Sequence, residues 1–199
     1  MAIDGARGPQ ADVQRLFVAI SIPDRVAATV EAAVGPWRPV LPHARWVPRS
    51  NWHVTLRFLG PTSSRLVPWI RERLSQVAAT TSPFPSRVRT LGAFPSTRRA
   101  RVLWTGLDDL DGRLTALASA IQGSIGEELA PLERPFTAHM TVARSDTPLR
   151  LPENFSETSL ESEIFTVGAF VLMRSDIHRQ GSRYEPLGTY PLGGRAVQV

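Results

Sequence analysis

Two stretches of the sequence place a histidine two residues before a threonine in similar surroundings. SNWHVTLRFLG, residues 50–60, contains His53 and Thr55, and RPFTAHMTVAR, residues 134–144, contains His139 and Thr141. An imidazole has a reference pKa of about 6.5, so one of two facing histidines can accept a proton at neutral pH while the other donates one. Such a pair can activate an attacking oxygen and protonate a leaving oxygen at phosphorus, while threonine hydroxyls hold the phosphoryl oxygens.

The two stretches must be strands if they are to present these groups together. Side chains alternate along a strand, so the histidine and threonine of each motif share one face. The opposite face is apolar, and in the first stretch it comprises Val54, Leu56 and Phe58. Taken alone, either histidine fits an ordinary strand histidine without a catalytic role. Because the arrangement recurs in two apolar strands, we favour one shared site over two coincidences.

Two arginines follow the motifs, and alternation gives them different expected orientations. Arg57 lies on the face of His53, where we interpret it as an exposed charge. Arg144 points away from the His139 face unless the strand twists or ends there. A phosphate-binding role and a solvated or structural role therefore both stay open for Arg144.

Other residues that could carry chemistry have plainer interpretations. Phe17 lies in an apolar strand and is interpreted as a core residue, with stacking on a nucleobase as the alternative. Arg98, Arg99 and Arg101 lie beside a turn, where a solvated loop end is the default and an RNA backbone contact the alternative. The remaining two histidines lack the motif and are interpreted as loop residues, His43 and His178.

Composition excludes several classes of function. The 199-residue chain has no cysteine, so disulfides, cysteine-based zinc sites and thiol nucleophiles are excluded. No carboxylate or third histidine lies at ligand spacing near either motif, so we expect no metal and no cofactor. No apolar run approaches the roughly 18 residues that span a bilayer, and no secretory signal is visible, so we expect a cytoplasmic protein.

The basic residues are unusual because all 23 are arginine, against 18 acidic residues, which gives a net charge of +5. Guanidinium groups bind phosphate oxygens bidentately, so the excess is a weak indication of an anionic partner. A GC-rich coding sequence is the plainer explanation for the absence of lysine.

Hydrophobic periodicity predicts the elements that position the motifs. Helices are expected over residues 24–34, 65–79 and 110–125, and residues 145–162 are interpreted as a long exposed loop. Besides the motif strands, apolar runs predict strands over residues 16–20, 88–94, 101–107, 164–173 and 184–192. Because strands and helices do not alternate strictly, the pattern favours an α+β fold with antiparallel sheets.

The motifs and their flanking segments resemble those of a known family. HVTLRFLG and HMTVAR resemble the paired motifs of the two-histidine phosphoesterase superfamily, and in particular its RNA 2′,3′-cyclic phosphodiesterases, also called 2′-5′ RNA ligases. The flanking segments RLFVAISIP, AFPSTRRARVLWTGL and LMRSDIHRQGSRYEPLGTYPL extend the likeness over nearly all the chain after residue 14. One departure is Ala138, where the family usually has proline before the second histidine.

The resemblance implies a fold and a reaction. Residues 15–199 are expected to form one bilobal domain, with two pseudo-symmetric lobes of antiparallel sheet around a central cleft, and residues 1–14 a flexible arm. It implies that His53 is the proton donor and His139 the proton acceptor in opening an RNA 2′,3′-cyclic phosphate to a 2′-monoester. Phosphate binding is assigned to three residues: Thr55, Thr141 and Arg144.

Further expectations and alternatives accompany this assignment. By reversal, the same site could join RNA ends through a 2′-5′ bond. The expected partner is RNA or a nucleotide with a cyclic phosphate end, and the protein is expected to be a monomer that contacts no membrane and no metal. The alternatives are a non-catalytic nucleotide- or RNA-binding module, or the same chemistry on another cyclic phosphate or on a 2′-5′ oligonucleotide.

Overall fold

The structure is a computed structural model, and it describes residues 13–109, 111–126, 129, 135–178 and 181–193. In these residues every strand pairing is antiparallel, which confirms the α+β class. The strands are β1 (Val13–Ser21), β2 (Arg45–Trp46), β3 (His53–Ser63), β4 (Phe84–Ser86), β5 (Val88–Phe94), β6 (Ala100–Leu107), β7 (His139–Leu149), β8 (Phe165–Val167), β9 (Ala169–His178) and β10 (Gly181–Pro191). The helices are α1 (Asp24–Val34), α2 (Trp37–Val40), α3 (Val67–Thr80) and α4 (Arg113–Ile125), with short 3-10 turns η1 (Arg49–Asn51), η2 (Ser64–Leu66), η3 (Thr97–Arg99) and η4 (Glu153–Glu157).

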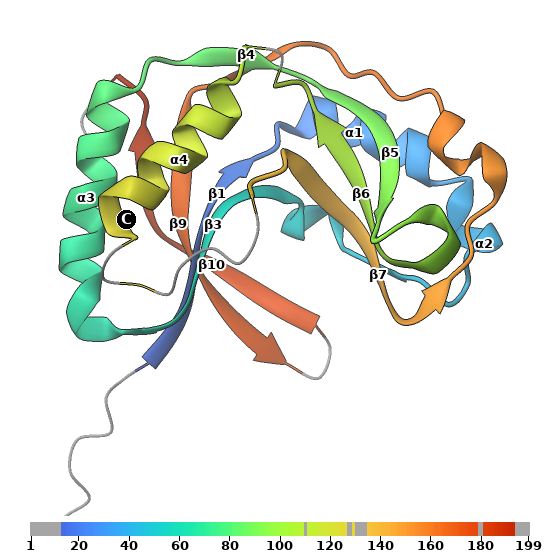
Figure 1. Ribbon diagram of the computed structural model, residues 1–199, viewed down its shortest axis with the longest axis horizontal. Coiled ribbons are helices and arrows are strands. Elements are labelled where there is room, and N and C mark those ends of the chain that lie inside the picture. The colour runs from blue at the N-terminus through green and yellow to red at the C-terminus, as the bar shows by residue number, and fades with distance from the viewer. Residues whose placement is uncertain (1–12, 110, 127–128, 130–134, 179–180, 194–199) are drawn as a thin grey trace, which may run out of the picture.

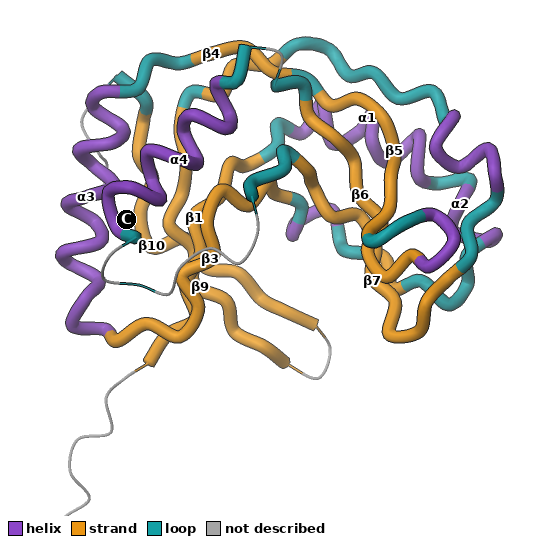
Figure 2. The backbone as a smooth tube through the Cα atoms, in the orientation of Figure 1, coloured by secondary structure: helices purple, strands orange, loops and turns teal. Residues whose placement is uncertain are grey.

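The strands form two lobes that meet in the middle of one sheet. Its order is β10-β9-β1-β3-β7-β6-β5, with β2 pairing to β7, while β4 and β8 form a separate small sheet. Figure 1 shows β1, β3, β9 and β10 with α3 and α4 on the left, and β5, β6 and β7 with α1 and α2 on the right. The tube in Figure 2 shows that strands of both lobes converge on the centre of the molecule.

Each long helix buries the face that its apolar residues predict. On α1, for example, Val26, Val30 and Val34 are buried at helical spacing. Two other faces are built in the same way, from Ile70, Leu74, Val77 and Ala78 on α3 and from Leu114, Leu117, Ala118, Ile121 and Ile125 on α4. These faces pack onto the sheets and close one hydrophobic core.

The third of the predicted helices, α4, begins later than predicted. It starts at Arg113, because the carboxylate of Asp109 accepts hydrogen bonds from the backbone N–H groups of Leu114 (2.7 Å) and Thr115 (3.0 Å). These bonds satisfy donors that the first helical turn leaves without a partner, and they set the start of the helix. Residue 110, the predicted start, lies outside the described residues.

The long exposed loop predicted for residues 145–162 is confirmed only in part. Residues 145–149 continue β7, and η4 follows. Phe155 is only 1% exposed and packs edge-on against Trp37, with ring centroids 5.2 Å apart. Leu151 and Leu160 are buried as well. The Ser, Pro and Glu residues dominate the composition of the segment, but these spaced apolar residues anchor it.

Smaller features complete the comparison with the expected elements. His43 lies in a turn as predicted, whereas His178 ends β9 and pairs with Gly181, so its prediction as a loop residue is wrong. The arm predicted for residues 1–14 lies almost wholly outside the described residues, although Val13 and Gln14 already belong to β1. Among the described residues, no helix is both long and apolar enough to cross a membrane.

Candidate active site

The two His-x-Thr motifs meet where the lobes join. Among the described residues, β3 and β7 pair at one position, Val54 with Met140, in antiparallel register. This register places His53 across from Thr141 and Thr55 across from His139. Val54 and Met140 are both fully buried, so the histidines and threonines on either side of them face away from the core, as alternation predicts. All four line one cleft of about 220 Å³.

Each imidazole is oriented by a hydrogen bond to its own strand entry. Nδ1 of His53 lies 2.7 Å from the carbonyl oxygen of Asn51, and Nδ1 of His139 lies 2.7 Å from that of Thr137. A carbonyl only accepts, so in both rings Nδ1 carries the hydrogen and donates it. Nε2 is therefore the atom that gains or loses a proton in each ring.

Aromatic side chains pack against the rings of both histidines. The ring of His53 lies between Phe17, with centroids 4.9 Å apart, and Tyr184, which meets it edge-on at 5.1 Å. The ring of His139 packs edge-on against Phe94 at 5.2 Å and lies 6.5 Å from Trp104. These contacts restrict rotation of both imidazoles, which favours a fixed direction for Nε2.

Asn51 ties the position of His53 to the β9–β10 hairpin. Its side-chain amide donates to the carbonyl of Ser182 at 2.8 Å, while its own carbonyl accepts from His53. Tyr184, two residues after Ser182, contacts the His53 ring. The hairpin therefore holds His53 through one hydrogen bond and one ring contact.

A β-bulge in each motif strand reverses the expected alternation. Val142 of β7 has no partner on β6, because Leu103 pairs with Ala143 and Trp104 with Thr141. The extra residue returns Arg144 to the face of Thr141, so Arg144 lines the cleft. This resolves the orientation that the sequence left open.

The same irregularity in β3 overturns two predictions. Leu56 has no partner on β1, since Val18 pairs with Arg57 and Ala19 with Thr55. Arg57 is consequently 2% exposed on the side away from the cleft, and its prediction as an exposed charge beside His53 is wrong. Phe58, predicted to face the core, lines the cleft and is 63% exposed.

Phe17 is buried, but it does not belong to the main core. It is 3% exposed and lies on the cleft face of β1, beneath the ring of His53 and beside Tyr184. Leu16 and Val18 point to the opposite side and join the core cluster. Phe17 thus supports a site residue from below, a role that neither sequence interpretation included.

The environment of His53 favours its neutral form. Burial lowers the pKa of His53 below 6.5, and the hydrogen bond to the Asn51 carbonyl raises it. The positive charges of Arg144 and His139 lower the pKa further.

The chain matches a known protein family over most of its length. The profile of the 2′-5′ RNA ligase superfamily matches residues 22–179. The chain belongs to this superfamily. The resemblance inferred from the two motifs is therefore confirmed.

Individual members of the superfamily match nearly the whole chain. A Thermus thermophilus protein named RNA 2′,3′-cyclic phosphodiesterase is 33% identical over 193 residues, covering 90% of this chain and 91% of that protein. A Geobacillus stearothermophilus protein of the same name is 28% identical over 184 residues, and the match spans 89% of this chain but only 57% of that relative. The crystal structure of TT0787 from Thermus thermophilus superposes with a TM-score of 0.76 at 30% identity, covering 90% of this chain and 98% of that one. This structure confirms the bilobal fold class.

Several cleft residues were not among the site residues predicted from the sequence. Tyr184, Asn51, Val47 and Val102 line the cleft. Asn51 and Val47 come shortly before the first motif, so the expectation of a cleft around His53 could have found them. Tyr184 and Val102 come from strands remote in sequence, and only the strand order brings them to the site.

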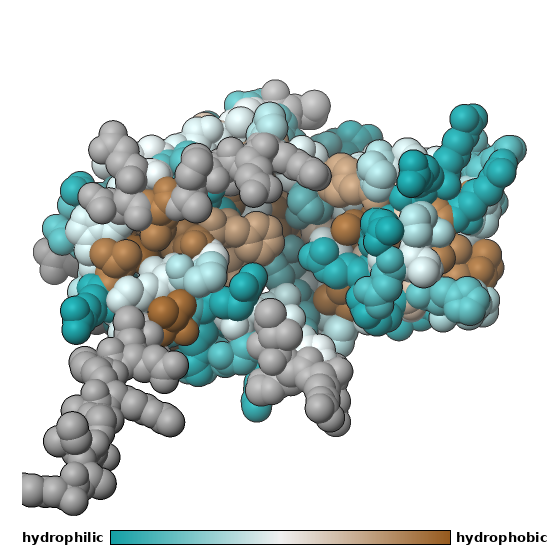
Figure 3. Space-filling view, turned by 60° about the horizontal axis from the view of Figure 1, so that its bottom comes forward, coloured by the Kyte–Doolittle hydropathy of each residue, from teal (hydrophilic) through white to brown (hydrophobic). Residues whose placement is uncertain are grey.

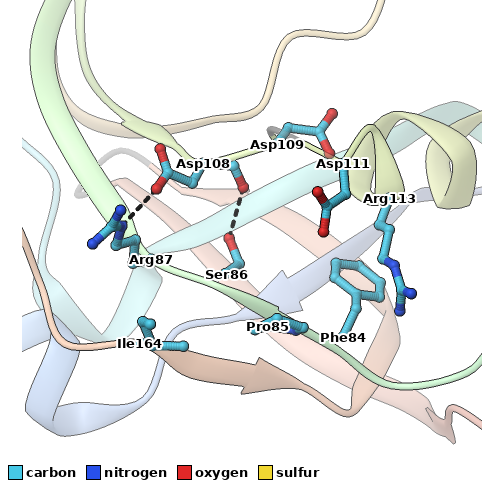
Figure 4. A pocket seen from close by; sticks show the side chains of 9 residues that line it. All are labelled: Phe84, Pro85, Ser86, Arg87, Asp108, Asp109, Asp111, Arg113 and Ile164. Carbon is cyan, nitrogen blue, oxygen red and sulfur yellow. Dashed lines mark hydrogen bonds and ion pairs between the residues drawn. The ribbon is translucent and has the colours of Figure 1, made fainter.

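A second cavity, of about 170 Å³, lies near the start of α4 (Figure 4). Three of its charged groups already have structural partners: Arg87 pairs with Asp108 at 2.6 Å, and Asp109 caps the helix. Ser86 donates to the carbonyl of Asp108. None of the His-x-Thr residues reaches it, so the cleft between the lobes is the candidate active site. The described residues contain no group of three His, Cys, Asp or Glu side chains arranged to hold a metal ion.

Proposed function

We propose that this protein hydrolyses RNA 2′,3′-cyclic phosphate ends to 2′-phosphomonoesters by acid–base catalysis that needs no metal ion. One observation carries the proposal: two His-x-Thr motifs meet across one pair of residues on a shared cleft, and among the described residues neither Nε2 atom has a hydrogen-bond partner. Relatives named RNA 2′,3′-cyclic phosphodiesterase, one of them 33% identical with 91% of its length covered, support this general activity.

The proposed reaction needs one base, one acid and a phosphate clamp. His139 Nε2 accepts a proton from water, and the water oxygen attacks phosphorus. The bond from phosphorus to the ribose 3′-oxygen breaks, and His53 Nε2–H protonates that oxygen, leaving a 2′-phosphomonoester and a 3′-hydroxyl. In the described part of the chain, the hydroxyls of Thr55 and Thr141 have no intramolecular partner, so both are available to donate to the phosphoryl oxygens.

Arg144 and Phe58 complete the proposed substrate contacts. Arg144 is exposed on the cleft wall, and its guanidinium can pair with the negative charge of the phosphate. Phe58 offers an exposed aromatic face in the same cleft, on which a nucleobase can stack. Stacking accepts any base, so this contact favours RNA ends without selecting their sequence.

The protein's own charges and the burial of His53 oppose its donor role, since a donor must carry its proton. Burial and the charge of Arg144 both lower the pKa of His53. A phosphodiester anion bound beside Arg144 introduces the opposite charge and raises the pKa again. We therefore propose that His53 takes up its proton together with the substrate.

The test of activity uses a short oligoribonucleotide that ends in a 2′,3′-cyclic phosphate, incubated with the protein and EDTA. We expect turnover, with a 2′-monoester as the product in phosphorus NMR. His53→Ala and His139→Ala should each lower kcat by about 10²–10⁴-fold. The matched control is His43→Ala, which removes an exposed turn histidine outside the cleft and should leave kcat unchanged. Binding without turnover would favour the non-catalytic module, and a 3′-monoester would contradict the role order.

A substrate with sulfur in place of the bridging 3′-oxygen tests which histidine is the donor. A thiol has a pKa of about 8.5, so a thiolate leaves without being protonated first. We expect the thio substrate to restore much of the activity of His53→Ala and little of that of His139→Ala. The reverse pattern would exchange the two roles.

Two further proposals concern the setting of this reaction. We propose a cytoplasmic monomer, which cell fractionation and the molar mass in solution would test. Reversal of the hydrolysis predicts 2′-5′ joining when a 5′-hydroxyl oligonucleotide replaces water as the attacking group. Mixing the two RNA ends at high concentration and digesting the product with a 3′-5′-specific nuclease would detect the resistant linkage.

A further inference from the structure

Exposed arginines gather at one end of the right-hand lobe, beside the cleft. They come from distant parts of the sequence, and strand pairing brings them together: Arg45 pairs with Arg144, Arg144 with Val102, and Ala100 with Leu149. The backbone N–H of Leu151 donates to the carbonyl of Thr97 at 2.8 Å, which holds the segment after β7 against η3. We call these six residues the arginine cluster: Arg45, Arg98, Arg99, Arg101, Arg144 and Arg150.

The cluster has almost no internal counter-charge. Residue 45 and residues 97–101 and 144–150 together contain six arginines and one acid, Asp146, so their net charge of +5 equals that of the whole chain. Asp146 pairs with Arg45, and its carbonyl accepts from Arg101. Among the described residues, the other four members form no ion pair.

Several arginines elsewhere in the fold are neutralised. Arg25 pairs with Glu163, Arg38 with Glu31 and Arg174 with Glu185. Unpaired like charges repel one another and gain from an anionic ligand. A surface that concentrates them beside the cleft therefore favours a polyanion. Figure 3 shows hydrophilic residues gathered over the right-hand lobe, which contains β5, β6 and β7.

The position of the cluster relates it to the reacting phosphate. Val102 and Arg144 form part of the cleft wall. Ala100, the first residue of β6, comes two residues before Val102, which at about 3.3 Å per residue places it about 7 Å further from the cleft. Arg99 ends η3 directly before Ala100. The cluster thus starts at the cleft and leads outward along the end of the lobe.

We propose that the arginine cluster binds the backbone phosphates of the RNA strand that precedes the cyclic end, so that oligonucleotides are better substrates than mononucleotides. The inference rests on the proposed function, because the reacting end must occupy the cleft. Guanidinium groups match phosphate geometry bidentately. Contacts to phosphate carry no base information, so the preference is for chain length and not for sequence.

The test compares 2′,3′-cyclic AMP with a short oligoribonucleotide that ends in the same cyclic nucleotide. The variant is Arg98→Ala/Arg99→Ala/Arg150→Ala, which spares Arg144 in the proposed site. The matched control is Arg15→Ala/Arg65→Ala/Arg113→Ala, which removes the same charge from exposed positions on the other lobe. We expect the cluster variant to lose at least about 10-fold in kcat/KM on the oligonucleotide at low salt, while both variants keep wild-type kcat/KM on 2′,3′-cyclic AMP.

Salt dependence gives a second readout. Each contact to a single-stranded phosphate contributes about 0.7 to the slope of log affinity against log salt, so three lost contacts lower the slope by about 2. Between about 50 and 200 mM salt, the wild type should therefore lose about 16-fold more oligonucleotide activity than the cluster variant. The proposal would be overturned if salt lowered the oligonucleotide activity of the wild type and the cluster variant equally. It would also be overturned if salt lowered the activity on 2′,3′-cyclic AMP as much as that on the oligonucleotide. Neither result would contradict the proposed function.

Binding separates this proposal from the proposed function. Fluorescence anisotropy of the labelled oligonucleotide measures the cluster even if neither substrate is turned over. Weaker binding in the cluster variant than in the control variant supports the assignment, and equal binding overturns it. Polyglutamate of matched charge serves as a competitor that represents an acidic protein partner. If polyglutamate displaced the RNA at equal concentration, the assignment of the cluster to RNA would also be overturned.

Discussion

Gly92 of β5 lets the indole of Trp104 lie where it supports His139, and replacing this glycine should damage catalysis without touching the cleft. An added Cβ at Gly92 would lie 2.3 Å from Cζ2 and 2.4 Å from Cη2 of Trp104. Ordinary contacts begin at 3.4 Å, so in Gly92→Ala the indole must move by about 1 Å. Trp104 also packs on Phe94, with centroids 5.1 Å apart, and both rings adjoin His139.

The expected effect of Gly92→Ala has a stability part and a catalytic part. Overpacking of this kind costs about 1–3 kcal/mol of unfolding free energy, which lowers the Tm of a domain this size by about 2–4 °C per kcal/mol. A displacement of about 1 Å at a catalytic group can cost about 10²-fold in rate. We therefore expect kcat on a cyclic-phosphate oligonucleotide to fall by about 10- to 100-fold at temperatures where the variant is fully folded.

Two matched variants separate misplacement from general damage. Gly123→Ala adds the same methyl group on α4, where nothing lies within 4 Å, and should keep wild-type kcat. Trp104→Phe removes the ring atoms that collide, so the double variant Gly92→Ala/Trp104→Phe should recover most of the lost kcat. A folded Gly92→Ala protein with wild-type kcat, or a double variant no better than the single one, would refute the reasoning.

Three other predictions follow from the site and the core. Thr55→Ala or Thr141→Ala removes one donor to charged phosphoryl oxygens, worth about 1.5–3 kcal/mol, so kcat/KM should fall by about 10- to 100-fold; unchanged kinetics would remove that threonine from the site. The pKa of His53 should lie below 6.5 when measured by NMR, and Arg144→Ala should raise it. Since the pKa of His53 is lower in the folded than in the unfolded protein, the free energy of unfolding should decrease as the pH falls through 6.5. This decrease should be absent in His53→Gln. Burial raises the pKa of Tyr190 to about 12, so the ultraviolet absorbance of the wild type should show one tyrosine ionising near that pH. This ionisation step should be absent from Tyr190→Phe.

The motif strands show how far the sequence alone predicts this site. Alternation placed His53 with Thr55 and His139 with Thr141 correctly, because each pair is separated by one residue before either bulge. It failed for Arg57 and Phe58, which follow the unpaired Leu56. A bulge depends on how two neighbouring strands align, and the sequence of residues 56–58 does not by itself predict that alignment.

Helices were easier to predict than the walls of the cleft. The apolar spacing of α1 predicted both of its ends, since the face it buries is contained in its own sequence. Phe94, Trp104 and Tyr184 support the histidines from three different strands. Their roles depend on strand order and could not be deduced before the sheet was known.

The two halves of the site share a backbone plan but differ in side chains, and the proposed mechanism depends on this difference. Phe58 and Arg144 each lie five residues after a motif histidine, and each reaches the cleft through a bulge. One half therefore contributes an aromatic face and the other a positive charge. In the proposed mechanism a symmetric backbone brings an acid and a base to a single phosphate, but two identical imidazoles would have no fixed roles. The Arg144 charge lowers the pKa of the half-buried His53, so in the proposed mechanism the pairing of unlike side chains at equivalent positions distinguishes the two roles.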